Sequence, residues 1–302
     1  MRAVVTGGAG FIGSTLVDEL LARGDEVHVV DDLSAGKRGQ VAPTAALHVL
    51  DIREPLAHAL ADVRPEVVFH LAAQVDVRAS VADPVDDART NVLGTVNVLE
   101  LARVHDAQVV FASTGGAMYG ECDERPAREN DERCPLSPYG TSKLAGEEYL
   151  ATWNRLYGTR HVALRLGNVY GPRQDPHGEA GVVAIFLSRI AEGRSGTIFG
   201  DGAQTRDYIF VGDVVRAFVA AAHAGGGVFN VGTGVETSVL ELWEASRDAT
   251  GIDAVVTHDP PRLGELARSC LDPSRAAQEL GWRAEVPLAE GLRRTWEWIR
   301  EE

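Results

Sequence analysis

The chain has 302 residues, of which 45% are hydrophobic and 24% are charged, so it is long enough for one large globular domain or two interlocked ones. Its net charge of −15 argues against a nucleic-acid-binding surface, which needs clustered basic residues. Because no apolar run approaches the roughly 20 residues of a membrane span, and Cys122, Cys134 and Cys270 are too scattered for a disulfide framework or a zinc site, we expect a cytoplasmic protein with no metal and no membrane partner.

The first stretch of the chain predicts a strand, a glycine-rich turn and a helix. Ala3 to Val5 is a short apolar run, and the turn after it matches G-x-G-x-x-G at Gly8, Gly10 and Gly13 and G-x-x-G-x-x-G from Gly7. Apolar residues then recur at helical spacing: Phe11, Ile12, Leu16, Val17, Leu20 and Leu21. Such glycines permit a tight turn, a close approach of a pyrophosphate to the backbone and close packing of the helix on the strand. The helix N-terminus then favours the anion.

The residues after this helix support a dinucleotide site. Glu26 to Val30 is predicted to be a second strand, and Asp31 follows it 18 residues beyond Gly13, where a carboxylate binds an adenosine ribose hydroxyl. A carboxylate repels a 2′-phosphate, so Asp31 favours NAD over NADP. Lys37 and Arg38 are the counter-indication, and a glycine turn in a cofactor-free protein is the alternative.

Strands and helices alternate through the rest of the first half. The predicted strands are Leu47–Leu50, Glu66–His70, Gln108–Ala112 and His161–Leu166, and the predicted helices are Glu54–Asp62, Pro84–His105 and Ser137–Tyr157. This alternation predicts an α/β fold, a doubly wound parallel sheet of the Rossmann type with helices on both faces. Ligands of such sheets bind beyond the carboxyl ends of the strands.

The second half is richer in glycine, proline and arginine from residue 167 onward, which predicts a smaller C-terminal lobe. The later predicted elements are a helix at Val214–Ala222, a strand at Val228–Val231 and helices at Val239–Thr250, Pro273–Leu280 and Leu288–Arg300. We expect the first helix and the strand to return to the main sheet. The expected division is therefore 1–166 plus about 211–232 for the cofactor-binding domain, and 167–210 plus about 233–302 for the substrate-binding lobe.

Candidate proton-transfer residues open the second long helix. Tyr139 and Lys143 are four residues apart and so share one helix face. Free tyrosine has a pKa near 10, and a neighbouring ammonium lowers such a pKa by roughly 1–3 units. The pair therefore predicts a proton shuttle, although this spacing also occurs in ordinary surface pairs.

Two hydroxyl residues precede this pair. Ser113 and Thr114 end a predicted strand, and Tyr139 lies 25 residues beyond Thr114. A hydroxyl at this strand end is placed to bind the same substrate oxygen as the tyrosine. The alternative is an ordinary turn that ends the strand.

The motifs in chain order identify a family. They are the glycine turn, Asp31, Asp51-Ile52, His70-Leu71-Ala72-Ala73-Gln74, Asn91, Ser113-Thr114, Tyr139 with Lys143, and Leu166-Gly167-Asn168-Val169-Tyr170-Gly171-Pro172. Together they resemble the extended short-chain dehydrogenase/reductase family across nearly the whole chain. Within that family the chain is most similar to the UDP-glucose 4-epimerases, also called UDP-galactose 4-epimerases.

The resemblance implies NAD as the cofactor and assigns residues to each part of it. The pyrophosphate would lie against Gly7, Gly10, Phe11 and Ile12. The adenosine would contact Asp31, Asp32, Ser34, Ala35, Gly36, Asp51 and Ile52. The nicotinamide side would be lined by Leu71, Ala72, Ala73, Gln74, Asn91, Tyr139 and Lys143.

The resemblance also implies a catalytic group and a substrate site. Tyr139 would be the base, Lys143 would tune it, and either Thr114 or Ser113 would bridge to the sugar hydroxyl. The UDP-sugar would contact Thr114, Asn168, Arg173, Val183, Arg206, Arg262 and Glu265. Arginine suits a diphosphate because its planar fork binds phosphate oxygens bidentately.

The residues after Thr114 discriminate among reactions of this family. Its 4,6-dehydratases have an Asp-Glu pair there and its UDP-glucuronate decarboxylases a glutamate, whereas this chain has Gly115 and Gly116. The resemblance therefore implies an isomerase of carbohydrate and galactose metabolism, an epimerase that inverts C4 of a UDP-hexose (UDP-glucose or UDP-galactose) through a transient 4-keto intermediate.

Several alternatives stay open at this stage. UDP-glucuronate is an alternative substrate, because the UDP-glucuronate 4-epimerases share this order of motifs. UDP-N-acetylglucosamine is another, because Ser269 occupies the place of a bulky residue that restricts N-acetylated sugars in the epimerases. A nucleotide-sugar reductase and a non-catalytic NAD-binding protein are the other classes. The resemblance further implies a homodimer in which the helices at Pro84–His105 and Ser137–Tyr157 form a four-helix bundle with those of a second copy.

Overall fold

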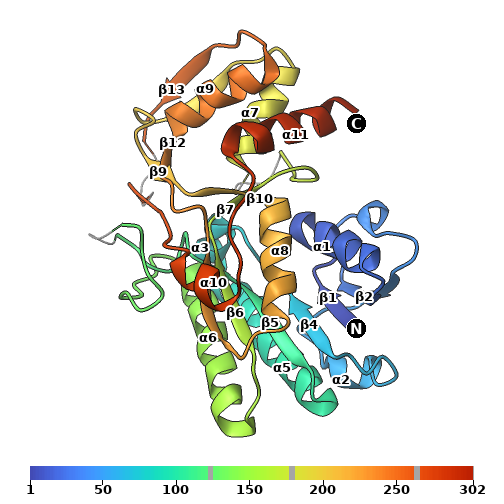
Figure 1. Cartoon of the computed structure of the whole chain (residues 1–302). Coiled ribbons are helices and arrows are strands. Elements are labelled where there is room, and N and C mark those ends of the chain that lie inside the picture. The colour runs from blue at the N-terminus through green and yellow to red at the C-terminus, as the bar shows by residue number, and fades with distance from the viewer. Residues whose placement is uncertain (122–124, 177–180, 262–265, 302) are drawn as a thin grey trace.

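The computed structural model describes residues 1–121, 125–176, 181–261 and 266–301. Its main sheet is parallel and has seven strands in the order β11-β6-β5-β4-β1-β2-β3 (Figure 1). In chain order they are β1 (Arg2–Thr6), β2 (Glu26–Asp31), β3 (Ala46–Val49), β4 (Val67–His70), β5 (Gln108–Thr114), β6 (Val162–Leu166) and β11 (Gly227–Val231). The predicted doubly wound sheet is confirmed.

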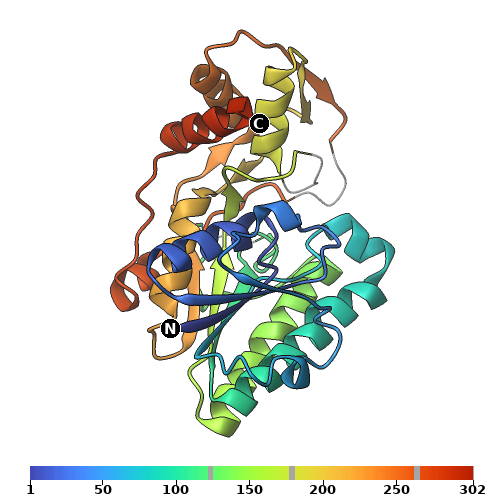
Figure 2. The same cartoon turned by 90° about the vertical axis from the view of Figure 1, so that its right-hand side faces the viewer.

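Two layers of helices cover the main sheet. One face packs against α1 (Phe11–Ala22), α8 (Val211–Ala221) and α10 (Ser274–Glu279), and the other against α2 (Leu56–Ala59), α5 (Gly94–His105) and α6 (Pro138–Tyr157). Strands covered on both sides need apolar residues on both faces, which explains continuous runs such as β4, in which every residue is buried. Figure 2 shows the sheet edge-on between these layers.

The predicted helix Pro84–His105 is wrong as a single regular helix. The structure has α4 (Pro84–Ala88), a π-helical turn (Arg89–Leu93) and then α5, and a further short helix, α3 (Val77–Ala82), comes before α4. Asp76 caps α3 and Asp83 caps α4 by accepting backbone N–H groups of the first turn. A π-turn changes the helix by one residue, which a period of 3.6 does not reveal.

The predicted helix Glu54–Asp62 is also too long, because α2 has only four residues. Pro55 precedes it and takes an extended conformation, so the helix begins at Leu56. A 3₁₀ turn, Arg38–Gln40, lies between β2 and β3. The hydrophobic pattern predicted neither the short length of α2 nor this 3₁₀ turn.

The smaller lobe lies beyond the carboxyl ends of the strands of the main sheet (Figures 1 and 2). It contains α7 (Val182–Ala191), α9 (Val239–Thr250), α11 (Leu288–Glu301) and the strand pair β8 (Gly196–Phe199) and β13 (Val256–Asp259). Two further pairs, β7 (Asn168–Tyr170) with β10 (Tyr208–Phe210) and β9 (Thr205–Arg206) with β12 (Thr237–Ser238), connect it to the sheet.

The core of this lobe is built from the apolar faces of its helices. Phe186 of α7 meets Trp243 of α9 edge to face, with ring centroids 5.0 Å apart. A capping box of Ser238 and Glu241 begins α9 and Gly251 ends it in the left-handed conformation. Within the described ranges, no helix combines the length and the apolar character needed to cross a membrane.

Candidate active site at the carboxyl ends of the strands

The glycine turn joins β1 to α1. Gly7 has φ +70°, and a Cβ on Gly13 would lie 2.1 Å from the carbonyl oxygen of Gly7, so α1 can begin here only with glycine at both positions. Gly10 is the N-cap of α1 and, within the described chain, no side chain caps this end and no acidic residue stands in the first turn. The open N–H groups of this turn fit the pyrophosphate of NAD.

Asp31 lies directly beside this turn at the end of β2. Its buried carboxylate accepts hydrogen bonds from the N–H groups of Ala9 and Leu33, both at 2.9 Å. A Cβ on Gly36 would lie 2.8 Å from Oδ1 of Asp31, so Gly36 and Asp31 are in contact. A carboxylate oxygen accepts more than one hydrogen bond, so the position fits a ribose hydroxyl. Asp32 binds Ser34 and points outward.

The predicted adenine contacts follow β3. Asp51 forms an ion pair with Arg53 at 2.6 Å, and this pair holds the pKa of the Asp51 carboxyl below its usual range. Ile52 is buried, and a Cβ on Gly94 would lie 2.6 Å from its Cδ1. Gly94 therefore lets α5 approach the end of β3.

The residues that follow β4 are tied to the glycine turn. The hydroxyl of Thr6 accepts hydrogen bonds from the N–H groups of Leu71 and Ala72, both at 3.2 Å, and a Cβ on Gly7 would lie 2.7 Å from the nitrogen of Ala72. Ala73 lies in the same short segment. These contacts bring the predicted nicotinamide side to the same edge as the pyrophosphate turn.

Gln74, at the end of this segment, is hydrogen-bonded to Asn91 of the π-turn. The N–H of Gln74 donates to Oδ1 of Asn91, and Nδ2 of Asn91 donates back to the carbonyl of Gln74, both at 2.9 Å. Nδ2 of Asn91 also donates to Asp87 at 3.0 Å. Sequence reasoning missed Asp87, because nothing in the pattern distinguishes it from its exposed neighbour Asp86.

Tyr139 and Lys143 lie in the first turns of α6. Ser137 caps the helix by accepting the N–H of Gly140 at 3.1 Å, which fixes where the helix begins. Nζ of Lys143 lies 6.0 Å from the centre of the Tyr139 ring and donates to the carbonyl of Ala112 at 2.9 Å. The pair therefore shares one face of α6, next to the end of β5.

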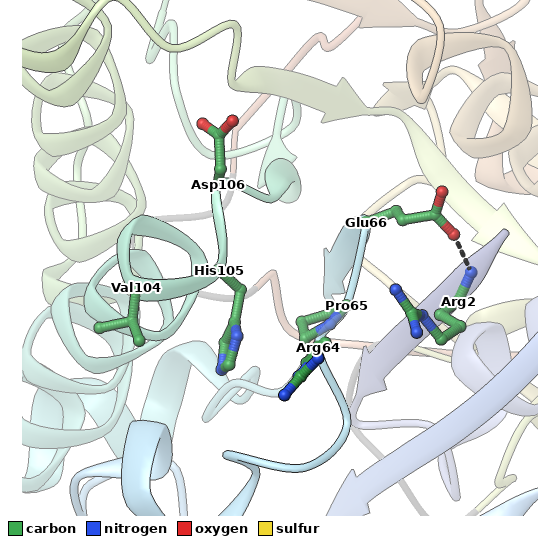
Figure 3. Close-up of a pocket in the computed structure, with 7 residues that line it drawn as sticks. All are labelled: Arg2, Arg64, Pro65, Glu66, Val104, His105 and Asp106. Carbon is green, nitrogen blue, oxygen red and sulfur yellow. Dashed lines mark hydrogen bonds between the residues drawn. The ribbon is translucent and has the colours of Figure 1, made fainter.

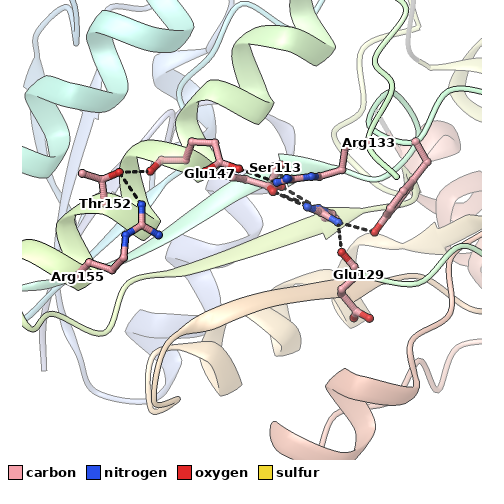
Figure 4. A network of polar contacts seen from close by, with 9 residues as sticks. Ser113, Glu129, Arg133, Glu147, Thr152 and Arg155 are labelled. Atoms are coloured by element: carbon pink, nitrogen blue, oxygen red, sulfur yellow. Dashed lines mark hydrogen bonds and ion pairs between the residues drawn. The ribbon is translucent and has the colours of Figure 1, made fainter. Parts of the chain in front are cut away.

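Thr114 is the hydroxyl that the structure brings to Tyr139, where its hydrogen-bonding group acts to lower the pKa of the phenol. The hydroxyl of Ser113 instead donates to Oε1 of Glu147, further along α6, at 2.5 Å. Glu147 is a buried partner of Arg165, with Nη2 and Oε2 2.7 Å apart. Figure 4 shows this network, in which Ser113 points to Glu147.

One electrostatic expectation is wrong for the protein chain alone. Burial raises the pKa of Tyr139 to about 12, against a smaller opposing effect of its hydrogen bond with Thr114. Burial also lowers the pKa of Lys143 to about 8. Desolvation disfavours both charged forms, so it outweighs the effect expected from the ammonium.

The predicted substrate residues are spread over the lobe and its connections. Asn168 on β7 lies near Arg206 on β9, because the N–H of Asn168 donates to the carbonyl of the next residue, Asp207, at 2.7 Å. Nη1 of Arg206 donates to the carbonyls of Thr205 and Leu266. Arg173 has φ +74° and pairs with Asp18 of α1 at 2.6 Å. Arg262 and Glu265 lie outside the described residues.

Val183 is a substrate candidate whose side chain is enclosed. It is 1% exposed and packs in the core of the lobe with α7. Its apolar side chain therefore contributes to the core of the lobe, and its contact with the substrate stays a prediction. The sequence could not show this, because a buried valine and a site-lining valine have the same pattern.

Gly116, Asn168 and Ser269 meet although they are far apart in the sequence. A Cβ on Gly116 would lie 3.7 Å from Oδ1 of Asn168 and 4.0 Å from Oγ of Ser269. The three residues therefore border one space close to Thr114. Gly116 has no side chain and that of Ser269 is small.

A shallow pocket lies at the other end of the sheet and is not part of this site. It is lined by Arg2, Arg64, Pro65, Glu66, Val104, His105 and Asp106, at the amino ends of β1 and β4 (Figure 3). Ligands of parallel sheets bind at the carboxyl ends. Tyr139, Thr114 and the glycine turn all lie at that opposite end.

Comparisons with known proteins agree with this arrangement. The NAD-dependent epimerase/dehydratase family model matches residues 3–232. The UDP-glucose 4-epimerase of Mycolicibacterium smegmatis is 50% identical over 99% of both chains. Two solved structures of UDP-glucose 4-epimerases are also similar. The Thermotoga maritima enzyme with UDP-glucose has 45% identity, a TM-score of 0.97 and coverage of 100% of this chain and 99% of its own. The Thermus thermophilus enzyme in complex with NAD has 46% identity, a TM-score of 0.95 and 99% coverage of both chains. The chain belongs to the NAD-dependent epimerase/dehydratase family.

Proposed function

We propose that this protein is an NAD-dependent epimerase that inverts C4 of a UDP-hexose and so interconverts UDP-glucose and UDP-galactose. One observation carries the proposal: Thr114, Tyr139 and Lys143 meet at the sheet edge that also carries the glycine turn and Asp31. The relatives support the substrate class, since proteins 45–50% identical to this chain are UDP-glucose 4-epimerases.

The chain's own residues divide the proton chemistry among them. Tyr139 takes the proton of the sugar 4-hydroxyl and gives it back, while Thr114 hydrogen-bonds the same oxygen. Lys143 is the cation beside the phenol, 6.0 Å from the ring, and favours its ionised form. Bound NAD supplies the acceptor for the hydride of C4 and the means to return it. Gly7, Gly10, Phe11 and Ile12 would hold its pyrophosphate, and Asp31 its ribose.

Inversion requires the keto sugar to turn without leaving. In our proposal the diphosphate of the substrate stays bound to arginines of the lobe. One of them is Arg206 on β9, which lies near Asn168 because the next residue, Asp207, accepts the N–H of Asn168. A guanidinium group binds phosphate oxygens through two parallel hydrogen bonds, which would hold the nucleotide while the hexose rotates. The division into a cofactor domain and a substrate lobe is part of this proposal.

The small residues near Thr114 favour a second substrate as well. Gly115 and Gly116 provide no acid that would expel a hydroxyl group or assist decarboxylation, which leaves oxidation and re-reduction. Ser269 and Gly116 border one space beside Asn168. Neither Ser269 nor Gly116 is bulky, so UDP-N-acetylglucosamine is the second candidate.

We also propose a cytoplasmic homodimer. Leu93 and Val104 on one helical segment and Tyr149 and Leu156 on α6 are large apolar side chains with 38–66% of their surface exposed. Apolar residues that gather on neighbouring helices are typical of a protein interface. Sedimentation at micromolar concentration should find a dimer, and a monomer would contradict this assembly.

Substitution of the proposed base tests the assignment. Tyr139→Phe removes only the hydroxyl group, so interconversion of UDP-glucose and UDP-galactose should fall by roughly 100-fold or more because general acid–base catalysis is lost. Tyr157→Phe is the matched control, because Tyr157 is an exposed tyrosine at the other end of α6. Near-normal turnover in Tyr139→Phe with intact NAD content would overturn the proposal.

A further inference from the structure

Asp87 is a carboxylate with no access to solvent. It lies in α4 and is 0% exposed, whereas the side chain of the adjacent Asp86 is 48% exposed and pairs with Arg53 at 3.1 Å. Burial of a carboxylate is costly unless its charge is compensated. Asp87 is buried beside α6, the helix that carries the proposed catalytic residues. Its position in the short helix α4 does not by itself explain why a carboxylate is buried there.

The groups that directly contact Asp87 are neutral. Oδ1 accepts hydrogen bonds from Nε2 of Gln74 and Nδ2 of Asn91, both at 3.0 Å, and Oδ2 accepts one from the hydroxyl of Ser142 at 2.6 Å. Asp213, which is equally buried, is instead paired directly with Arg216 at 2.6 Å. Among the described residues, Asp87 therefore has no cation in direct contact. The nearest candidate for a counter-charge is Lys143, which follows its hydrogen-bond partner Ser142 in the sequence.

That counter-charge is on α6. Ser142 immediately precedes Lys143 and lies three residues after Tyr139, so the hydrogen bond from Ser142 anchors Asp87 at the turn that carries both proposed catalytic groups. Asp87 raises the pKa of Lys143, against the larger lowering that comes from burial, and it also raises the pKa of Tyr139. The carboxylate thus acts electrostatically on both.

The other charges in this region do not replace it. Asp76 of the preceding segment caps α3, and Asp86 is engaged with Arg53. Burial and Lys143 lower the pKa of His70 at the end of β4 to about 3, so its ring is neutral. Glu147, one turn beyond Lys143 on α6, is neutralised by Arg165 at 2.7 Å. Asp87 is therefore the fully buried carboxylate of this region that lacks a directly paired cation among the described residues.

The π-turn provides the geometry of the cluster. Asn91 lies within it, four residues after Asp87, and its side chain reaches both the carboxylate and the backbone of Gln74. π-turns often occur at functional sites because they redirect a side chain out of the regular helical positions. The turn thus connects Asp87 to the segment proposed to line the nicotinamide.

We propose that Asp87 is a positioning residue of the catalytic site, whose buried carboxylate keeps Lys143 as an ammonium beside Tyr139 and joins Gln74, Asn91 and Ser142 into one hydrogen-bonded cluster. This role rests on the proposed epimerase function. It adds a group outside the tyrosine and lysine pair that sets the charge on which the pair depends. It also explains why a buried carboxylate contacts three neutral donors here.

The sequence offers a direct way to measure this effect. The chain has only two lysines, Lys37 and Lys143, and Lys37 is exposed. Lysine labelled with ¹³C at Cε therefore gives two signals in an NMR titration of the purified protein, and Lys143→Met identifies one of them. In the unsubstituted protein the Lys143 signal should titrate near pH 8, since burial lowers its pKa to about 8.

Asp87→Asn removes the charge but keeps the shape. The amide oxygen can still accept from Gln74 and Asn91, and its NH₂ can donate to the Ser142 hydroxyl. The Lys143 titration should move to lower pH by about one unit, which is a tenfold change in its protonation, while Lys37 stays in place. The alkaline limb of kcat should move in the same direction, because the ammonium form is lost at lower pH.

Two further variants make the outcome decisive. Asp213→Asn is the matched control, a neutralised carboxylate with 0% exposure that contacts the backbone at residues 285 and 286, and it should leave the Lys143 titration in place. Asp87→Glu retains the charge and should restore the titration toward that of the unsubstituted protein. If Asp87→Asn does not fold, Asp87→Ser neutralises the same position.

An unchanged Lys143 titration in a folded, neutral Asp87 variant would overturn the role of Asp87, whatever its turnover. The titration needs no substrate. Its result is therefore separate from the proposed function, which fails if the unsubstituted protein does not interconvert the UDP-sugars. If the Lys143 titration shifts but the protein has no epimerase activity, Asp87 still controls the charge of Lys143, and the pair serves a different reaction.

Discussion

At the residue scale, opposing effects set the pKa of the Tyr139 phenol. Burial raises its pKa to about 12, and the hydrogen bond with Thr114 opposes this. A phenol with so high a pKa is a poor base at neutral pH, so the site needs positive charge close to the ring. Lys143 supplies such a charge from the same helix face, and Asp87 keeps it available in our proposal.

The two hydroxyls that end β5 should respond differently to substitution. Thr114→Val removes the hydroxyl that acts on Tyr139 and should lower kcat by roughly 100-fold, as loss of a single preorganised donor does. Ser113→Ala removes a 2.5 Å hydrogen bond to the buried Glu147. It should lower the free energy of unfolding by about 2 kcal/mol.

Steady-state kinetics and urea unfolding of both variants check this assignment. Thr114→Ser, which keeps a hydroxyl group, should recover most of the kcat lost in Thr114→Val. A larger loss of kcat in Ser113→Ala than in Thr114→Val would show that the serine is the hydroxyl partner of Tyr139.

Single residues were predictable where chemistry and spacing coincide. Tyr139 and Lys143 follow from one helix face, Thr114 is one of two hydroxyl candidates at a strand end, and the structure brings the three together. Asp87 was not predictable, because its burial depends on a π-turn and on the packing of α6 against α4. Likewise only the fold shows that Ser113 points to Glu147.

At the element scale, the junction of β1 and α1 is the part least able to change. A Cβ on Gly13 would lie 2.1 Å from a backbone oxygen, and backbone cannot move aside as a flexible side chain does. Gly13→Ala should therefore destabilise the protein by about 3 kcal/mol and displace the first turn of α1. The purified variant should retain less than a tenth of the normal NAD.

Gly39→Ala is the matched control for this change, because nothing lies within 4 Å of the Cβ that it adds. Urea unfolding and the absorbance of NAD released by acid report the two effects separately. Full NAD content and unchanged stability in Gly13→Ala would contradict the proposed pyrophosphate site.

Helices were predictable in proportion to the clarity of their ends. Val239–Thr250 was predicted at its observed bounds, and the structure shows Ser238 capping its start and Gly251 ending it. The helix Val182–Ala191 was missed, because it is apolar on most sides and follows a glycine-rich stretch that suggested only short elements. The short strands between the sheet and the lobe carry too few residues for any period to appear.

At the scale of the whole molecule, the order of strands explains why one edge carries the chemistry. β1 lies between β4 and β2, and β5 follows β4, so the glycine turn, Asp31 and Thr114 end on neighbouring strands. The sequence predicted the parallel sheet and its alternation with helices. It did not predict the π-turn or the pairs β7–β10 and β9–β12 that connect the lobe to the sheet.

The most direct test of the account uses UDP-glucose that carries deuterium at C4. The purified protein should convert it to an equilibrium mixture containing UDP-galactose, with the deuterium still at C4, because the hydrogen removed from that carbon returns to the same carbon on its other face. Proton NMR of the sugar products, together with the absorbance at 340 nm, measures both the inversion and the absence of net reduction. Retained label in UDP-galactose is the predicted result. Absence of UDP-galactose, or its formation with loss of the label to water, would contradict the proposed inversion at C4.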